Sequence, residues 1–182
     1  GVQTCALPDL NGHSEVPRED ADEALRVMRS LAPELHIDPD KIGVSGTSAG
    51  GHLAASVGTL SPQRPSFMIL FYPVISADTD KRHRGSFEQL LGKKHCDTPQ
   101  SQELSLEKKV DVQTPPTLLF HCDDDKVVPA VNSVLFYKQL KTYGIKSSLH
   151  IYPSGGHGWG MSSCFRYYDD WQKSVLDWLS TL

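Results

Sequence analysis

The sequence lacks a long hydrophobic run and any excess of positive charge. Its 182 residues carry 18 Lys and Arg against 22 Asp and Glu, which gives a formal net charge of −4. Binding to nucleic acid needs a basic surface, and the one basic cluster, residues 81–84, holds three Lys and Arg side chains. The longest strongly apolar run, residues 67–75, is far too short to span a bilayer. The sequence therefore predicts no nucleic-acid partner and no membrane partner.

Residue patterns typical of metal sites are also missing. Cys96, Cys122 and Cys164 form no CxxC pair or other ligand spacing. The eight histidines include no HExxH pair or similar arrangement. We therefore expect no cofactor and no catalytic metal.

Helix-like and strand-like segments alternate along the chain. Helical periodicity predicts helices over residues 17–32, 49–60, 132–143 and 166–182, and short apolar runs predict strands over residues 41–45, 67–75, 117–121 and 148–152. Such alternation is typical of βαβ units, and strands that are apolar on both faces belong to a parallel sheet covered on both sides. The predicted fold class is α/β, with a doubly wound, mostly parallel sheet and helices on both faces.

Residues 77–114 interrupt this alternation. The stretch is long, charged and polar, with one short apolar group at Phe87, Leu90 and Leu91. Two interpretations stay open: a lid-like insertion above the edge of the sheet, or a loose surface insertion.

A glycine-rich motif, Gly46-Thr47-Ser48-Ala49-Gly50, joins a predicted strand to a predicted helix. This context is typical of a nucleophile elbow, in which a serine sits on a strained turn. The positions two before and two after the serine must be small to avoid collision, and glycine occupies both. The free N–H groups at the start of the helix, including that of Ala49, would face a developing oxyanion.

A serine hydroxyl needs a base to act as a nucleophile, and the base needs an orienting acid. Acidic residues Asp123, Asp124 and Asp125 follow one predicted strand, and His157 follows the last one within a glycine-rich loop. The carboxyl ends of parallel strands meet at one edge of the sheet, where Ser48 also lies. The order Ser, Asp, His along the chain is that of an α/β-hydrolase triad, so the sequence predicts a serine-hydrolase site.

Four segments carry a resemblance to a known family: "NGHSEVPREDADEALRVMR", "DPDKIGVSGTSAGGHLAAS", "HCDDDKVVP" and "YPSGGHGWG". They resemble α/β-hydrolase esterases of the bacterial acetylxylan-esterase and carbohydrate-esterase type. The resemblance implies that Ser48 is the nucleophile, His157 the base and Ala49 an oxyanion donor through its N–H. It assigns the acid to Asp125, by its short spacing to a Val-Pro pair, and Asp124 remains the alternative.

The same resemblance implies a carboxylic-ester hydrolase that deacetylates plant polysaccharide such as xylan, in a secreted or periplasmic setting. A serine peptidase of the same fold is the alternative, because its triad would be identical. A nucleotide-binding α/β module is a further alternative, but the turn lacks Gly-Lys-Ser/Thr and the G-x-G-x-x-G spacing.

The start of the chain departs from this pattern. "GVQTCALP" resembles the translated end of a short-read sequencing adapter, so we expect residues 1–8 to be a non-native leader and Cys5 not to be a native thiol. Residues 9–182 would then be a partial catalytic domain. The family's His-Gly-Gly loop, which supplies further oxyanion donors, and the first strands of its sheet are not recognisable ahead of residue 41. We therefore expect this chain alone to have little activity.

Overall fold

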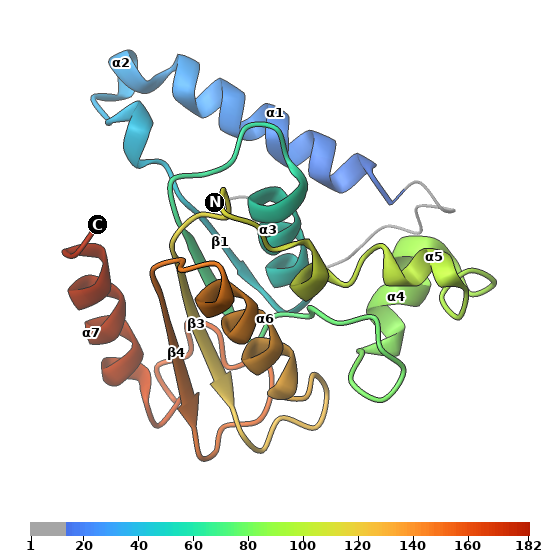
Figure 1. Cartoon of the computed structure of the whole chain (residues 1–182). Coiled ribbons are helices and arrows are strands. Elements are labelled where there is room, and N and C mark those ends of the chain that lie inside the picture. The colour runs from blue at the N-terminus through green and yellow to red at the C-terminus, as the bar shows by residue number, and fades with distance from the viewer. Residues whose placement is uncertain (1–13) are drawn as a thin grey trace.

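The computed structural model describes residues 14–182, so the expected leader, residues 1–8, lies outside the described residues. Figure 1 shows helices arranged around a central sheet. In chain order, the elements are α1 (Val16–Ser30), α2 (Ala32–Leu35), η1 (Pro39–Lys41), β1 (Val44–Thr47), α3 (Ser48–Leu60), β2 (Met68–Phe71), α4 (Arg84–Leu91), α5 (Pro99–Gln102), η2 (Leu106–Lys109), β3 (Thr117–Cys122), α6 (Val131–Thr142), β4 (Ser147–Tyr152) and α7 (Tyr168–Leu179).

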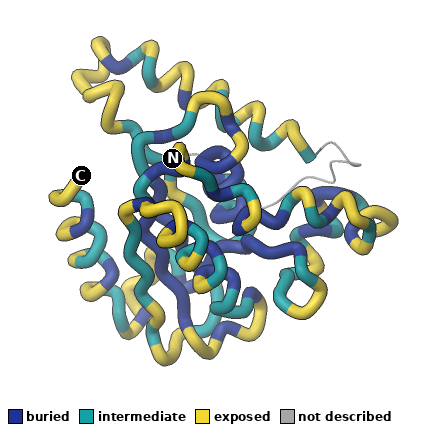
Figure 2. The backbone as a smooth tube through the Cα atoms, viewed as in Figure 1, coloured by how far each residue is buried: buried dark blue, intermediate teal, exposed yellow. Residues whose placement is uncertain are grey.

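The sheet has four strands in the order β1-β2-β3-β4, and every neighbouring pair is parallel. All residues of β2 and β3 are buried, and Figure 2 shows this buried centre in dark blue. Strands buried on both faces read as continuous apolar runs, which is why the sequence pattern predicted them. The carboxyl ends of all four strands lie at one edge of the sheet.

Helices cover both faces of the sheet, as predicted. On one face, α3 and α6 pack on β-strand side chains, with Ala55, Leu70, Leu119 and Phe136 in one cluster. On the other face, α7 contributes Trp171 and Trp178 to an aromatic cluster with Phe71 and Phe120. Alternate residues along a strand point to opposite faces, so Leu119 and Phe120 belong to different clusters.

All four strands differ from their predicted bounds, β3 and β4 by one residue at one end, and β1 and β2 by up to three and four residues. Strand β1 begins at Val44 rather than at residue 41, because the carboxylate of Asp38 accepts a hydrogen bond from the Asp40 N–H at 2.9 Å and starts the short helix η1. Strand β2 ends at Phe71 rather than at residue 75. Tyr72 has φ of +37°, and Pro73 has no N–H to donate to a sheet ladder. Because β1 and β2 are parallel, the turns that follow them lie at the same edge of the sheet.

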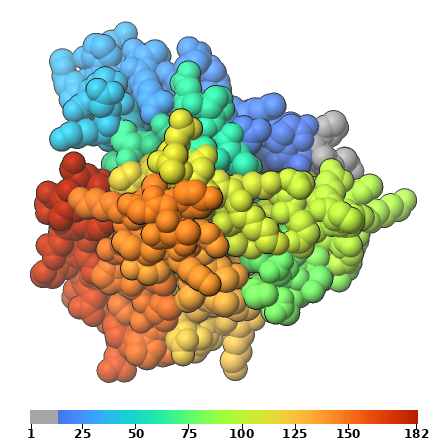
Figure 3. Space-filling view, in the orientation of Figure 1, coloured from blue at the N-terminus to red at the C-terminus, as the bar shows by residue number. Residues whose placement is uncertain are grey.

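The segment over residues 77–114 is packed rather than loose. It contains α4, α5 and η2 and buries Phe87 and Leu91 against Val74 and Val128. The amide of Asn132 anchors its start: its oxygen accepts the N–H groups of residues 75 and 76, and its nitrogen donates to the carbonyl of residue 81. In the space-filling view of Figure 3, the segment forms a green and yellow-green lobe at the side of the molecule.

None of the helices within residues 14–182 combines the length and the apolar character that crossing a bilayer would require.

Candidate active site

Ser48 stands at the junction of β1 and α3, directly after the last residue of the strand. Its φ of +54° lies in the left-handed region, which is costly for a residue with a side chain. The turn is tied to the segment after β2, because the Ser48 carbonyl accepts the Val74 N–H at 3.1 Å. The structure therefore has the strained strand-to-helix turn that the sequence predicted.

The glycines around this turn have unequal roles. A Cβ atom on Gly46 would lie 2.1 Å from the carbonyl oxygen of Gly50, so only glycine fits there. A Cβ atom on Gly50 would meet no atom within 4 Å, which corrects the prediction that this position must be small. The second close approach is at Gly51, where a Cβ would lie 2.7 Å from the Cβ of Pro73.

Three side chains predicted to act together are joined by hydrogen bonds. His157 Nε2 lies 2.8 Å from Ser48 Oγ, and His157 Nδ1 lies 2.6 Å from Asp125 Oδ2. The Asp125 side chain is fully buried and that of His157 is 15% exposed. A serine hydroxyl bonded to an imidazole, whose other nitrogen is held by a buried carboxylate, is an arrangement that activates serine as a nucleophile.

Asp125 is held as an anion by four donors. Its Oδ1 accepts the N–H groups of Val127 and Val128, both at 2.9 Å, while its Oδ2 lies 2.6 Å from His157 Nδ1 and 3.3 Å from His121 Nε2. Burial raises the pKa of this carboxyl, but the bonds from His121, His157 and the two backbone N–H groups outweigh it and hold the pKa well below its usual range. Asp125 is therefore an ionised partner for the imidazole.

His121 is a member of this group that the sequence analysis did not identify. Its Nε2 lies 2.8 Å from the Val128 carbonyl oxygen as well as near Asp125, so this nitrogen carries the proton. Its Nδ1 then accepts the Ser133 hydroxyl at 2.8 Å. The ring is completely buried. Its position at the end of β3, just ahead of the acids, was the available signal.

Asp124 does not contact His157; it holds the backbone of the loop that carries it. Its carboxylate accepts the Gly156 N–H at 2.8 Å and the Gly155 N–H at 3.3 Å. The carboxylate of Asp123, by contrast, makes no hydrogen bond to any residue from 14 to 182. The three successive acids therefore differ in role: Asp125 is buried beside His157, whereas Asp124 is exposed and bonds the loop backbone.

Tyr72 completes the surroundings of the imidazole. Its ring lies edge-on to that of His157 with centroids 4.7 Å apart, and its hydroxyl accepts the Gly160 N–H at 2.8 Å. The sequence analysis missed this residue, although a tyrosine directly after the second strand falls at the same sheet edge as Ser48. Ala49 lies in the first turn of α3, where N–H groups have no carbonyl partner within the helix.

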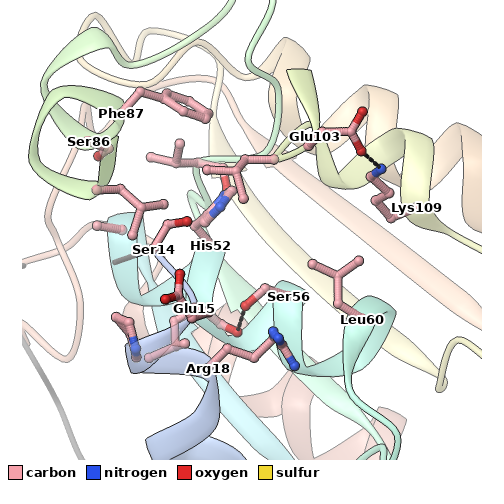
Figure 4. A pocket seen from close by; sticks show the side chains of 16 residues that line it. Ser14, Glu15, Arg18, His52, Ser56, Leu60, Ser86, Phe87, Glu103 and Lys109 are labelled. Atoms are coloured by element: carbon pink, nitrogen blue, oxygen red, sulfur yellow. Dashed lines mark hydrogen bonds and ion pairs between the residues drawn. The ribbon is translucent and has the colours of Figure 1, made fainter. Parts of the chain in front are cut away.

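A cavity of about 300 Å³ opens beside Ala49 and runs along α3 (Figure 4). His52 lies on its wall, one turn beyond Ser48, and its Nδ1 donates to the Val74 carbonyl oxygen at 3.1 Å. Burial lowers the pKa of His52 to about 4, although its backbone bond opposes this. The ring is therefore neutral at pH 7.

Residues 14–182 contain no group of three or more His, Cys, Asp or Glu side chains placed to hold a metal ion.

The chain is similar to several known proteins. An acetylxylan esterase of Xylanibacter ruminicola is 37% identical over 177 residues, which cover 94% of this chain and 37% of that protein. The crystal structure of an acetyl ester-xyloside bifunctional hydrolase from Caldicellulosiruptor lactoaceticus superposes with a TM-score of 0.85 at 40% identity, over 93% of this chain and 66% of that one.

A more distant structure has the same fold. It is MGS-M1, an α/β hydrolase from a Medee basin deep-sea metagenome, which matches with a TM-score of 0.68 at 29% identity over 91% of this chain and 65% of that one. The profile of the prolyl oligopeptidase family matches residues 10–182. Together with the parallel sheet and the strained serine turn, these matches identify the α/β-hydrolase fold, and the chain belongs to the prolyl oligopeptidase family.

Proposed function

We propose that this chain carries the catalytic residues of a carboxylic-ester hydrolase that removes acetyl groups from xylan or its oligosaccharides. The observation that carries the proposal is the continuous hydrogen-bond chain from Ser48 through His157 to the buried carboxylate of Asp125. It supplies a nucleophile, a base and an orienting acid in one line.

In this mechanism the Ser48 Oγ attacks the ester carbonyl carbon while His157 Nε2 takes the hydroxyl proton. Asp125 stabilises the imidazolium that forms. The Ala49 N–H donates to the oxyanion of the tetrahedral intermediate. When the intermediate collapses, His157 returns the proton to the departing alcohol. Water then attacks the acyl-enzyme with His157 again as base, which releases the carboxylic acid and restores Ser48.

The acetyl and xylan parts of the proposal come from the relatives. The two most similar proteins described above are named as an acetylxylan esterase and an acetyl ester-xyloside hydrolase. The chain spans 37% of the first protein's length, so the substrate of the whole protein is part of the proposal. Phe87, in the packed segment over residues 77–114, contacts His52 of α3 with ring centroids 5.7 Å apart. This segment is proposed to cover the active site.

The test replaces the nucleophile. Ser48→Ala should lower acetate release from acetylated xylo-oligosaccharides by at least about 10³-fold, since loss of a triad member typically costs several powers of ten. Ser174→Ala removes an exposed hydroxyl on α7 that bonds only its own helix, so it is the matched control and should keep the parent rate. A Ser48→Ala rate above about a hundredth of the parent rate would contradict the assignment.

A second candidate, a serine peptidase, is favoured by the name of the matching family. The same three side chains would serve both reactions. Comparing hydrolysis of 4-nitrophenyl acetate with that of a dipeptidyl 4-nitroanilide separates them. Ser48-dependent cleavage of the anilide in preference to the ester would favour the peptidase.

A further inference from the structure

We propose that His83 is a substrate-binding residue that donates a hydrogen bond from its Nε2–H to an oxygen of the departing sugar. This inference rests on the proposed function, because it takes Ser48 to attack a sugar ester. It adds to that function a residue that distinguishes a sugar from other alcohols.

His83 lies close to the turn after β3 that carries the acid of the triad. Two residues earlier, the Lys81 carbonyl accepts a side-chain N–H of Asn132 at 2.9 Å. Four residues later, Phe87 packs in one cluster with Val128. Both partners follow β3 in the stretch that contains the acid, so the segment is fixed to this turn on both sides of His83.

The His83 ring also lies close to the serine turn and the imidazole. Its hydrogen-bond partner Ser86 lines the same cavity as Ala49 (Figure 4). Burial is the main cause that lowers the pKa of His83; the charge of His157 lowers this pKa further, and that of Asp125 raises it. Such effects weaken with distance, so the ring lies within reach of the charges of the triad.

The two ring nitrogens of His83 have different roles. Nδ1 lies 2.9 Å from Ser86 Oγ and 3.3 Å from the Ser86 backbone nitrogen, at the start of α4. A backbone N–H only donates, so Nδ1 is an acceptor, and in the neutral ring the proton is on Nε2. This Nε2–H has no hydrogen-bond partner among residues 14–182. A Cβ on Gly85 would lie 3.3 Å from the ring Cε1, so the glycine keeps this edge of the ring uncovered.

A sugar oxygen is the partner that this donor fits. The departing alcohol takes its proton from His157 Nε2, so it lies beside the triad, as His83 does. The two neighbours of His83 in the chain are charged, but Arg82 and Arg84 both bond the carboxylate of Asp97. A neutral N–H between paired charges favours a neutral acceptor over an anion, and the hydroxyl and ring oxygens of a sugar are such acceptors.

Two replacements of His83 separate substrate binding from helix capping. Asn keeps an oxygen that can accept the Ser86 N–H, and it is a favoured N-cap residue, but it is too short to place a donor at the position of Nε2. Gln reaches about as far as Nε2 and carries an N–H donor, but it is not a favoured N-cap. His83→Asn should therefore stay stable and bind the sugar less well, whereas His83→Gln should lose stability and keep sugar binding.

The experiment compares acetate release from acetylated xylo-oligosaccharides with hydrolysis of 4-nitrophenyl acetate, which contains no sugar. His83→Asn should raise KM for the oligosaccharides about three- to tenfold, the worth of one hydrogen bond, with kcat within twofold of the parent. Its kcat/KM for 4-nitrophenyl acetate should stay within twofold. Xylobiose should inhibit 4-nitrophenyl acetate hydrolysis with a Ki raised by a similar factor. The control His95→Asn, at an exposed position of the same segment, should keep all parent values.

The outcomes separate the two proposals. Circular dichroism and melting temperature first confirm that each variant is folded. An unchanged oligosaccharide KM in His83→Asn would overturn the role of His83 and leave the esterase proposal standing. An equal loss with both substrates, or an equal rise of KM in His83→Gln, would do the same, since either would indicate a structural role. If the parent hydrolysed 4-nitrophenyl acetate through Ser48 but released no acetate from the oligosaccharides, the proposed substrate would be wrong, and the role of His83 would fall with it.

Discussion

The replacement Asp125→Asn tests the triad without changing the shape of its acid. The amide oxygen can still accept the N–H groups of Val127 and Val128, which hold the side chain in place at 2.9 Å. The amide nitrogen then takes the position of Oδ2, 2.6 Å from His157 Nδ1. Because an amide nitrogen only donates, His157 Nδ1 must accept, and its proton moves to Nε2. That proton faces Ser48, so the imidazole can no longer act as its base.

The magnitude follows from this change of tautomer. In a serine protease, the equivalent change lowers kcat by about 10⁴, and we expect a loss of this order here. The same nitrogen would also face the protonated Nε2 of His121 at about the observed 3.3 Å. Two buried donors would then oppose each other, which costs about 1–3 kcal/mol of unfolding free energy. The assay is kcat with 4-nitrophenyl acetate, together with urea unfolding.

Asp124→Asn is the matched control, since it removes the same charge from the neighbouring residue. One amide oxygen remains to accept the Gly156 N–H, which is the shorter of the two bonds. We expect a loss of at most about tenfold in kcat, by analogy with the small net worth of one hydrogen bond. If Asp124→Asn proved the more damaging change, the acid would have to be reassigned to Asp124. An Asp125→Asn rate within tenfold of the parent would refute the tautomer argument.

Two further predictions concern the serine turn and its helix. Gly46→Ala should unfold the turn or lower the free energy of unfolding by several kcal/mol, because its Cβ would lie 2.1 Å from a backbone oxygen. Gly50→Ala should be neutral or stabilising by about 0.5–1 kcal/mol. Thermal melts of the two variants check this. His52 has a folded pKa of about 4, below its ordinary 6.5, so its contribution to stability is complete above pH 6.5 and falls by about 3 kcal/mol as the pH drops to 4. The free energy of unfolding, measured with urea at pH 7, 5.5 and 4, should fall less with decreasing pH in His52→Gln than in the parent. The exposed control His95→Gln should follow the parent.

The order of the four strands and of helices α1, α3, α6 and α7 could be predicted from sequence, because buried parallel strands and amphipathic helices leave strong periodic patterns. The short helices α2, α4 and α5 were not predicted. The ends of strands could not. Strand β2 stops where Tyr72 turns to a positive φ, and this depends on the Ser48 carbonyl that receives the Val74 N–H from across the sheet edge. The run of apolar residues alone predicts that the strand continues to residue 75.

The candidate site shows the same division. Chain order and the glycine turn were enough to predict Ser48 and His157. The role of Asp124 depends on how the turn after β3 meets the loop after β4, some 30 residues later in the chain, whereas His121 contacts Asp125 only four residues further on. The spacing to the Val-Pro pair favoured Asp125 among the three adjacent acids, but the bond of Asp124 to the loop backbone could not be predicted from sequence.

The positions of the four strand ends divide the candidate site into two mechanical units. Asp124 bonds the backbone of the loop after β4, and Asp125 bonds the His157 ring on the same loop. The imidazole therefore moves with β3 and β4. Ser48 moves with β1 and α3. Tyr72 follows β2, and contacts between the two units include His157 Nε2 with Ser48 Oγ at 2.8 Å, the Gly160 N–H with the Tyr72 hydroxyl at 2.8 Å, and the Tyr72 and His157 rings with centroids 4.7 Å apart. A small sliding of β2 against β3 would therefore strain these contacts and leave the 2.6 Å bond to Asp125 intact. The stiffness of that one strand pairing sets how steadily the imidazole faces the hydroxyl.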